Sequence, residues 1–416
     1  MPPFKIGYNI NAEAPGANRQ LAADYQIALH STFTLVLDDY LNGKWFYTKQ
    51  IQALSPETDI THRRYWYVDP NNPLAGGWDG SLHRAPGITA ENIINTLEGE
   101  QRRGGVKVRE QIYNEPNVHR TAQDPQGNEL KTMLRLMVDC MKIASARDMR
   151  LAIDIGQPVT WVQAEFDAGF YDELIFTFAQ HPEHVLCIHL YGLGDLWFNT
   201  SEARMAMLSL TGVINTAQYI TQPDNVLKVD YLAQPDKGHF GREEMLAARA
   251  RRIGAPVPKM VVYEVGWDRT RISQQSDVDA INGRPAMGYP TLAQYWKVRY
   301  PQWTQARTAF EQIKWLHRAM PDYIVGACLY GFDTSFENGN YHLQNADLQK
   351  YLELYSIEVR YGQSAPPVIT PPPVVLPPAP NVRDAFDASE QQWIDREVKR
   401  DPLGTLAKLA GKANWK

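Results

Sequence analysis

The chain has 416 residues, of which 44% are hydrophobic and 21% charged, a balance typical of a globular protein with a sizeable core. Its formal net charge of −5 gives no reason to expect nucleic acid or an anionic membrane as a partner. No apolar run is long enough to span a bilayer. The N-terminus "MPPFKIGYNIN" has neither the basic nor the apolar region of a signal peptide. We expect no membrane span. The sequence does not identify the compartment, and it is compatible with extracellular or particle-associated action.

The number and spacing of the cysteines argue against a disulfide-stabilised protein. Cys140, Cys187 and Cys328 are far apart in the sequence and lie in apolar contexts. The pattern predicts buried free thiols and no disulfide framework.

Eight strand-like runs, rich in β-branched and aromatic residues, recur along the chain. They begin at Phe4, Phe33, Arg63, Val106, Arg150, His184, Lys259 and Tyr323. Between them lie segments such as "TAENIINTLEGEQRR" and "ELKTMLRLMVDCMKIASAR", whose apolar residues recur at the three- and four-residue spacing of one buried helical face. Thr89 is a small polar residue of the kind that begins a helix. A last helical run, "NADLQKYLELYSI", follows the eighth strand.

This alternation predicts parallel strands, and eight units suit a single (β/α)8 TIM barrel, here over residues 1–362. The rival architecture is an open, doubly wound α/β sheet. It would require a glycine-rich phosphate-binding fingerprint after an early strand, and the sequence has none.

The stretch "QIYNEPNVHR" places Glu115 between Asn114 and Pro116 where the fourth strand stops, since proline cannot continue a sheet ladder. By itself it fits a solvated turn as well as a site. In a TIM barrel, however, chemistry lies at the C-terminal strand ends, and "VVYEVGW" puts a second carboxylate, Glu264, at the end of the seventh strand. Paired carboxylates at a barrel mouth are what glycoside hydrolysis requires. The structural alternative is that Glu264 is neutralised by an arginine such as Arg269.

An Asn-Glu-Pro after strand four and a glutamate ending strand seven resemble the clan of retaining glycosidases built on TIM barrels. The resemblance implies that Glu115 is the general acid/base, that Glu264 is the nucleophile and that Asn114 binds the hydroxyl beside the reacting carbon. In "HLYG", after strand six, it implies that Tyr191 hydrogen-bonds the nucleophile with His189 beside it.

Two departures leave the subfamily and the substrate open. The second strand ends in "LDDY" where many members have an arginine that steadies the nucleophile. The eighth ends in "YGFDT" where many have a tryptophan under the sugar.

Four tryptophans follow the ends of predicted strands: Trp78, Trp161, Trp197 and Trp267. An indole suits the apolar face of a pyranose, so we expect sugar platforms among them. The alternative is that they cap the barrel or pin long loops. Their spread over several loops favours a β-linked polysaccharide or glycoconjugate in an open cleft, with an exo-acting enzyme as the runner-up.

Other chemistries find less support. His181 and His184 precede a strand, away from the rim, and fit a solvated turn better than a zinc site. Five strand-end residues (Asp38, Asp39, Asp69, Asp154 and His189) are conceivable metal ligands, but strand one has no HxH-type pair; we expect neither metal nor cofactor. No GxSxG elbow occurs. The competing function is a non-catalytic carbohydrate-binding or structural barrel, because a fold alone does not establish activity.

Beyond the barrel, "APPVITPPPVVLPPAP" (Ala365–Pro380) has eight prolines in sixteen residues, which predicts a semi-rigid linker over residues 363–381. Residues 382–416 are too few for a core of their own. They are interpreted as a disordered tail or as a docking segment that attaches the barrel to a larger assembly.

We predict that truncation at Gln363 shifts the melting temperature by only a few degrees, because the linker shares no periodic apolar pattern with the barrel. Differential scanning calorimetry of the truncated and full chains measures this. A large loss would mean that the tail packs on the barrel.

Overall fold

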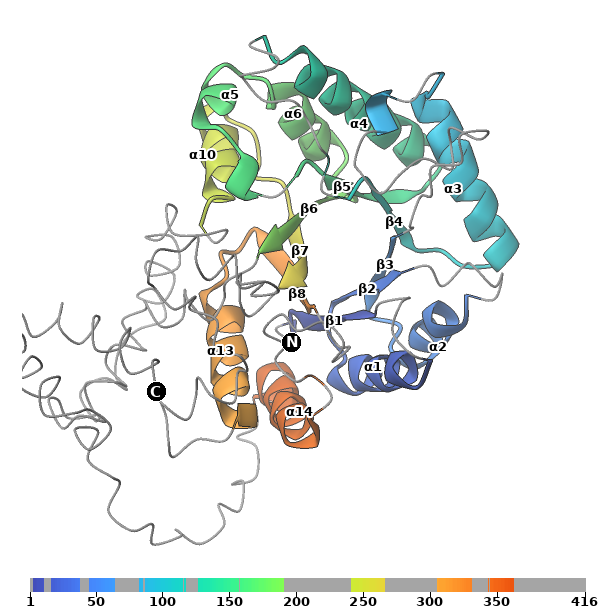
Figure 1. Cartoon of the computed structure of the whole chain (residues 1–416), viewed down its shortest axis with the longest axis vertical. Coiled ribbons are helices and arrows are strands. Elements are labelled where there is room, and N and C mark those ends of the chain that lie inside the picture. The colour runs from blue at the N-terminus through green and yellow to red at the C-terminus, as the bar shows by residue number, and fades with distance from the viewer. Residues whose placement is uncertain are drawn as a thin grey trace, which may run out of the picture.

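The computed structural model describes residues 3–10, 16–37, 45–63, 82–84, 87–114, 116, 126–156, 158–190, 241–265, 305–330, 343 and 345–362. Eight strands within these ranges form one closed parallel barrel in sequence order (Figure 1). They are β1 (Ile6–Ile10), β2 (Phe33–Leu37), β3 (Asp59–Arg63), β4 (Arg109–Ile112), β5 (Arg150–Asp154), β6 (Val185–Leu190), β7 (Met260–Val265) and β8 (Ile324–Leu329). Pairing of β1 with β8, Ile6 opposite Ala327, closes the ring. The predicted TIM barrel is confirmed.

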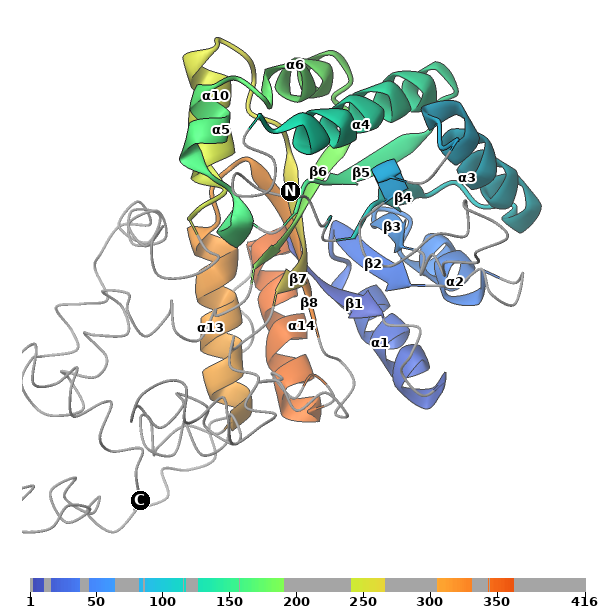
Figure 2. The same ribbon diagram turned by 45° about the horizontal axis from the view of Figure 1, so that its top comes forward.

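Helices surround the strands on the outside (Figures 1 and 2). They are α1 (Gly16–Leu29), α2 (Phe46–Leu54), α3 (Ala90–Gly104), α4 (Asn128–Ala146), α5 (Gln163–Asp167), α6 (Asp172–Gln180), α10 (Glu244–Arg252), α13 (Gln305–Ala319) and α14 (Ala346–Tyr361), with 3-10 turns η1 (Leu82–Arg84) and η2 (Pro158–Thr160). None of the helices in the described ranges is long and apolar enough to cross a membrane.

Capping residues set helix boundaries, and the predicted cap at Thr89 is confirmed. Thr89 Oγ1 accepts a hydrogen bond from the Asn92 N–H at the start of α3. Gly105 ends that helix at φ 64°, a left-handed conformation that glycine adopts without strain. Helix α14 ends likewise before Gly362. The linker and tail that follow lie outside the described residues, so their boundaries stay predictions.

The strands bury both of their faces, which is why strands such as β2, β7 and β8 are mostly apolar, whereas β3 and β4 carry buried polar side chains that pair with other strands. Outward side chains such as Tyr8 of β1 pack against the helices, while a separate inner cluster, which includes Leu35, Cys187 and Tyr263, fills the barrel. The three cysteines are buried and free, as predicted.

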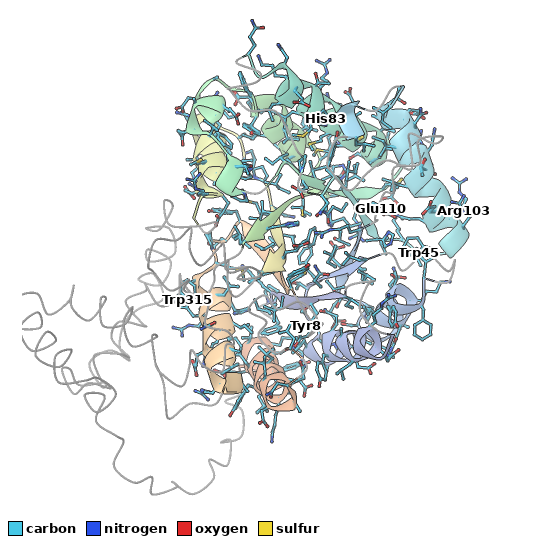
Figure 3. All side chains as sticks on the ribbon, in the orientation of Figure 1. Tyr8, Trp45, His83, Arg103, Glu110 and Trp315 are labelled. Atoms are coloured by element: carbon cyan, nitrogen blue, oxygen red, sulfur yellow. The ribbon has the colours of Figure 1, made fainter. Side chains whose placement is uncertain are left out.

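The layer between strands and helices also holds a buried polar pair. His62 Nδ1 lies 3.1 Å from Glu110 Oε2, and the Trp45 ring centroid is 4.5 Å from that of His62. Figure 3 places Glu110 and Trp45 beside α3. Gln101 of α3 donates to the other Glu110 oxygen, so this pair joins the helix to the strand.

One predicted strand is misplaced. The third strand was expected to begin at Arg63, but β3 instead ends there. The aromatic run "YWYV" after Arg63 carries strong β-propensity, and it lies outside the described residues. The observed strand, Asp59–Arg63, carries polar side chains at alternate positions because they point into the barrel.

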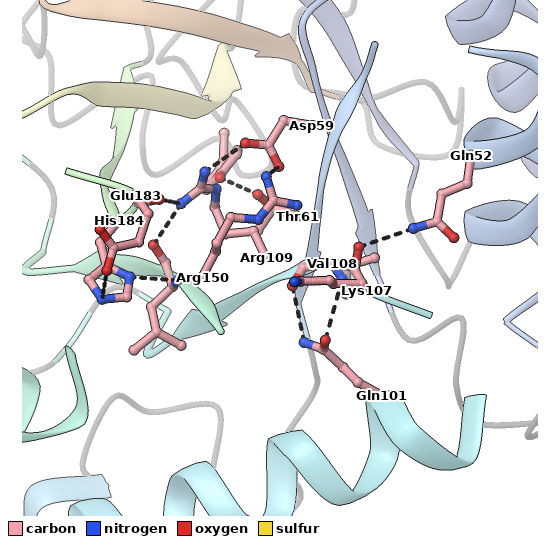
Figure 4. Close-up of polar contacts among 12 residues, drawn as sticks. Gln52, Asp59, Thr61, Gln101, Lys107, Val108, Arg109, Arg150, Glu183 and His184 are labelled. Atoms are coloured by element: carbon pink, nitrogen blue, oxygen red, sulfur yellow. Dashed lines mark hydrogen bonds and ion pairs between the residues drawn. The ribbon is translucent and has the colours of Figure 1, made fainter. Parts of the chain in front are cut away.

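The N-terminal end of the barrel is closed by charges (Figure 4). Asp59 on β3 pairs with Arg109 on β4 at 2.6 Å and with Arg150 on β5 at 3.0 Å. Arg109 also donates to the carbonyl oxygens of Leu151 and Glu183. These contacts join the starts of three strands, at the barrel face whose residues serve stability.

His184 belongs to this end and corrects the expectation of a solvated turn, since it is 1% exposed. Its Nδ1 accepts from the Leu151 N–H at 3.0 Å, and its Nε2–H donates to the Met141 carbonyl at 3.1 Å. Burial lowers the pKa of His184 to about 4, although the Met141 carbonyl acts in the opposite direction.

We predict that the free energy of unfolding decreases as pH falls from 6.5 toward 4. In that window the unfolded chain protonates His184 at its ordinary pKa while the folded chain keeps it neutral, so its stabilising contribution is complete above pH 6.5 and is lost on acidification. Urea unfolding at several pH values measures the slope. His184→Gln should reduce the slope of unfolding free energy against pH by an amount equivalent to about one bound proton. An unchanged slope in this variant would contradict the assignment to His184.

Candidate active site

Five inward side chains meet near the C-terminal ends of five strands. They are Arg63 on β3, Gln111 on β4, Asp154 on β5, His189 on β6 and Glu264 on β7. Each is at most 6% exposed. Burial of several charged groups in one place is costly unless they pair, so their contacts decide what the cluster can do.

Glu264 reaches the barrel interior through a bulge in β7. Ile188 and His189 are consecutive on β6, yet they pair with Val262 and Glu264, which leaves one extra residue on β7. The pairing with β8 shows the same irregularity between Val262 and Val265. Strict alternation would turn Glu264 away from the side on which Tyr263 lies in the inner cluster. The bulge re-aims its carboxylate inward.

Arg63 lies at the centre of the cluster. One terminal guanidinium nitrogen donates to Glu264 Oε1, the other lies 2.9 Å from His189 Nε2, and Nε donates to Gln111 Oε1 at 2.8 Å. Burial alone would lower the pKa of Arg63, but the charge of Glu264, together with Cys187 and Asp154, raises it further above its ordinary value. The guanidinium is therefore a permanent cation beside the Glu264 carboxylate.

These contacts fix the tautomer of His189. Arginine can only donate hydrogen bonds, so the His189 Nε2 accepts from Arg63. The ring proton then resides on Nδ1, which faces Glu264 Oε2 at 3.7 Å. A neutral imidazole and a cationic guanidinium thus present N–H groups to the same carboxylate.

Asp154, Cys187 and His189 carry potential metal-ligand atoms within 4.8 Å of one another. Three observations argue against a cation there. Arg63 occupies the His189 Nε2 lone pair. Burial raises the pKa of the Cys187 thiol well above its ordinary value, which disfavours the thiolate that a metal binds. The guanidinium charge also repels a second cation. We assign no metal centre to this cluster.

Strand β4 ends in a strained turn. Tyr113 has φ 68°, a left-handed conformation that costs a non-glycine residue about 1–3 kcal/mol. Its carbonyl accepts from Gln111 Nε2 at 2.9 Å. Asn114 follows, partly buried, and its Oδ1 has no hydrogen-bond partner among the described residues. Glu115 lies outside the described residues, so its distance from Glu264 stays a prediction.

The structure places three of the predicted site residues on the barrel rim. Glu264 and His189 lie together, and Asn114 begins the turn after β4. Trp161 lacks the open ring face that a sugar platform requires. It is 2% exposed, its indole N–H donates to the Gly156 carbonyl, and its ring packs against Phe166. This residue follows the alternative reading, since its contacts with Gly156 and Phe166 hold the segment between β5 and α5 in place.

The other predicted residues lie outside the described ranges: Glu115, Tyr191, Trp78, Trp197 and Trp267. Sequence reasoning missed Arg63 and Gln111. The alternation in "DITHR", with Asp59, Thr61 and Arg63 on one face, was the signal for Arg63. Because side chains alternate between the two faces of a strand, this pattern indicates that Arg63 points into the barrel at the end of β3.

No protein-family model and no curated protein matches the sequence. Among similar solved structures, the endo-beta-1,4-mannanase from Thermotoga petrophila is 11% identical with a TM-score of 0.40, over 87% of this chain and 78% of that one. The mannanase catalytic domain from Streptomyces sp. SirexAA-E is 14% identical with a TM-score of 0.28, over 66% and 83%. A glycoside hydrolase family 5 mannosidase from Rhizomucor miehei is 9% identical with a TM-score of 0.34, over 87% and 95%. Likeness at this level assigns no activity to the chain.

We predict that Arg63→Met lowers the free energy of unfolding by about 3–5 kcal/mol, because it leaves the Glu264 charge buried without its cation. Urea unfolding at neutral pH measures the loss. The double variant Arg63→Met/Glu264→Met should regain most of it, since the uncompensated charge is then removed. A loss below about 1 kcal/mol in the single variant would place the pair among weak, solvent-screened ion pairs.

Proposed function

We propose that the chain is a glycoside hydrolase that cleaves a β-linked polysaccharide or glycoconjugate by a retaining, double-displacement mechanism. The observation that carries the proposal is the bulge-directed Glu264 carboxylate, held by Arg63 and faced by His189 at the C-terminal end of the barrel. Chemistry in TIM barrels occurs at this end. The Asn114–Pro116 motif, which follows β4 in the chain, contains Glu115, the second carboxylate of the proposed pair.

In this mechanism the Glu264 carboxylate attacks the anomeric carbon while Glu115 protonates the departing glycosidic oxygen. The bond to the aglycone breaks, and a covalent glycosyl ester forms on Glu264. Glu115, now a carboxylate, takes a proton from water as that water attacks the same carbon and releases Glu264. For this retaining course the two carboxyl groups should lie about 5–5.5 Å apart, against about 6.5–9.5 Å for an inverting pair.

Arg63 and His189 both present N–H groups to the nucleophile, and the guanidinium charge has the larger part. The guanidinium stabilises the ionised carboxylate before attack. The attack consumes that charge, so the pairing must weaken as the ester forms, and it strengthens again as water releases the carboxylate. Asn114 would bind the hydroxyl next to the reacting carbon. Tyr191 is proposed to hydrogen-bond the nucleophile at the substrate site, and Trp78, Trp197 and Trp267 to contact the sugar.

A second candidate is a non-catalytic carbohydrate-binding or structural barrel. The same ion pair favours it, because a carboxylate fully neutralised by Arg63 can serve stability alone. In either case the segment 382–416 is proposed to dock on a larger assembly.

We predict that Glu264→Gln abolishes turnover on a panel of β-linked polysaccharides and aryl β-glycosides, because an amide cannot form the glycosyl ester. Glu115→Ala should slow substrates with poor leaving groups by about 10²–10⁴-fold and aryl glycosides far less. Added azide should restore part of that rate and yield a β-glycosyl azide. Product NMR and initial rates measure these effects.

Three results would contradict the mechanism. They are near-normal activity of Glu264→Gln, an azide product of the opposite anomeric configuration, and a wild-type chain that binds glycans without cleaving them. The last result would favour the non-catalytic barrel.

A further inference from the structure

Gln111 of β4 is a buried amide that contacts both halves of the proposed site. It is 2% exposed. Its Oε1 accepts from Arg63 Nε at 2.8 Å, and its Nε2 donates to the Tyr113 carbonyl at 2.9 Å. Arg63 in turn holds Glu264, while Tyr113 directly precedes Asn114 and Glu115 in the chain.

The two partners leave the amide one orientation. Arginine presents only donors and a carbonyl presents only an acceptor. A reversed amide would place its NH₂ against the Arg63 Nε–H and its oxygen against the Tyr113 oxygen. Both contacts would then be unfavourable in a dry interior, where unsatisfied polar groups are most costly. The position therefore requires a carboxamide, because a carboxylate satisfies only the contact with Arg63 and an apolar side chain of similar size satisfies neither.

The Tyr113 contact stabilises an unusual backbone. A buried aromatic residue at φ 68° persists only where its surroundings impose that conformation. Its ring is buried beside His83, at 6.0 Å between ring centroids, and its carbonyl is fixed by Gln111. This backbone conformation ends β4 and sets the direction in which Asn114 leaves the strand.

We propose that Gln111 is a positioning residue that couples the Arg63–Glu264 pair to the turn carrying Asn114 and Glu115. It does not touch the substrate. It holds the Arg63 guanidinium beside Glu264 and the backbone at Tyr113 and Asn114 in one mutual geometry. The proposal rests on the proposed function only for its effect on rate; the coupling itself is structural.

The main test is Gln111→Met, which removes both hydrogen bonds at similar volume. We expect kcat to fall by about 100-fold, with a much smaller change in KM, because misplacement of reacting groups by about 1 Å costs that much. The matched control is Gln26→Met on α1. Gln26 is also buried and makes two such bonds, from the Tyr8 N–H and to Ser31 Oγ, but it lies outside the barrel and should leave kcat unchanged.

Gln111→Glu separates the two contacts. A carboxylate still accepts from Arg63 Nε but faces the Tyr113 oxygen without a proton to donate. It also adds negative charge beside Glu264 and competes for the Arg63 cation, which favours the protonated form of the nucleophile. We expect the acidic limb of the kcat/KM profile to move to higher pH in this variant and to stay in place in Gln26→Met.

A readout independent of activity is hydrogen exchange of the Arg63 Nε–H and of the Asn114 backbone amide, followed by NMR. Both should exchange faster in Gln111→Met than in the wild type, and only the backbone amide should do so in Gln111→Glu. Unchanged exchange in Gln111→Met, or a kcat loss no larger than that of Gln26→Met, would overturn the proposal. A wild-type chain inactive on every glycan would refute the proposed function, while the exchange data would still decide whether Gln111 couples the two elements.

Discussion

The Arg63–Glu264 ion pair joins two strands on opposite sides of the ring, across 201 residues of sequence. Both side chains are almost fully buried, so their charges are stabilised by protein groups in place of water. The guanidinium also contacts His189 on β6 and Gln111 on β4. One cation therefore determines the positions of inward groups on three other strands. Apolar residues of similar volume are often at least as stabilising as a buried ion pair, so stability alone is a weak explanation of this charged cluster.

Both ends of the barrel contain buried or half-buried ion pairs, but the two sets of charges differ in what they contact. At the N-terminal end, ion pairs of Asp59 with Arg109 and Arg150 hold the first residues of three strands together. Arg109 also donates hydrogen bonds to two backbone carbonyls. At the C-terminal end, Glu264 faces an imidazole N–H and a guanidinium. The polar groups of the N-terminal cluster pair with one another and with the backbone, which stabilises the sheet. The C-terminal cluster concentrates donors on one carboxylate, as a site that stabilises a changing charge requires.

The backbone departs from regular geometry on the two strands that carry the proposed catalytic glutamates. Strand β7 contains the bulge before Glu264, and β4 ends in the left-handed Tyr113 before Asn114 and Glu115. In regular strands, the Glu264 side chain and the backbone after Tyr113 would take other directions, because side chains alternate strictly along a strand. Buried hydrogen bonds lie beside both irregularities: Thr61 contacts the Tyr263 hydroxyl, and Gln111 donates to the Tyr113 carbonyl. The irregular geometry thus occurs next to Glu264 on β7 and next to Asn114 after β4.

The barrel was readable from the sequence because alternating strand and helix periodicities are local signals, and so was the Thr89 cap. Glu264 was also placed correctly at the end of the seventh strand. The third strand was misplaced because "YWYV" has higher β-propensity than "DITHR", whose alternate polar residues are stabilised only by partners on other strands. Arg63 and Gln111 were missed for that reason, and Trp161 proved to be buried. Which residues face the axis depends on strand register, the β7 bulge and contacts across the ring, and these exist only once the barrel has closed.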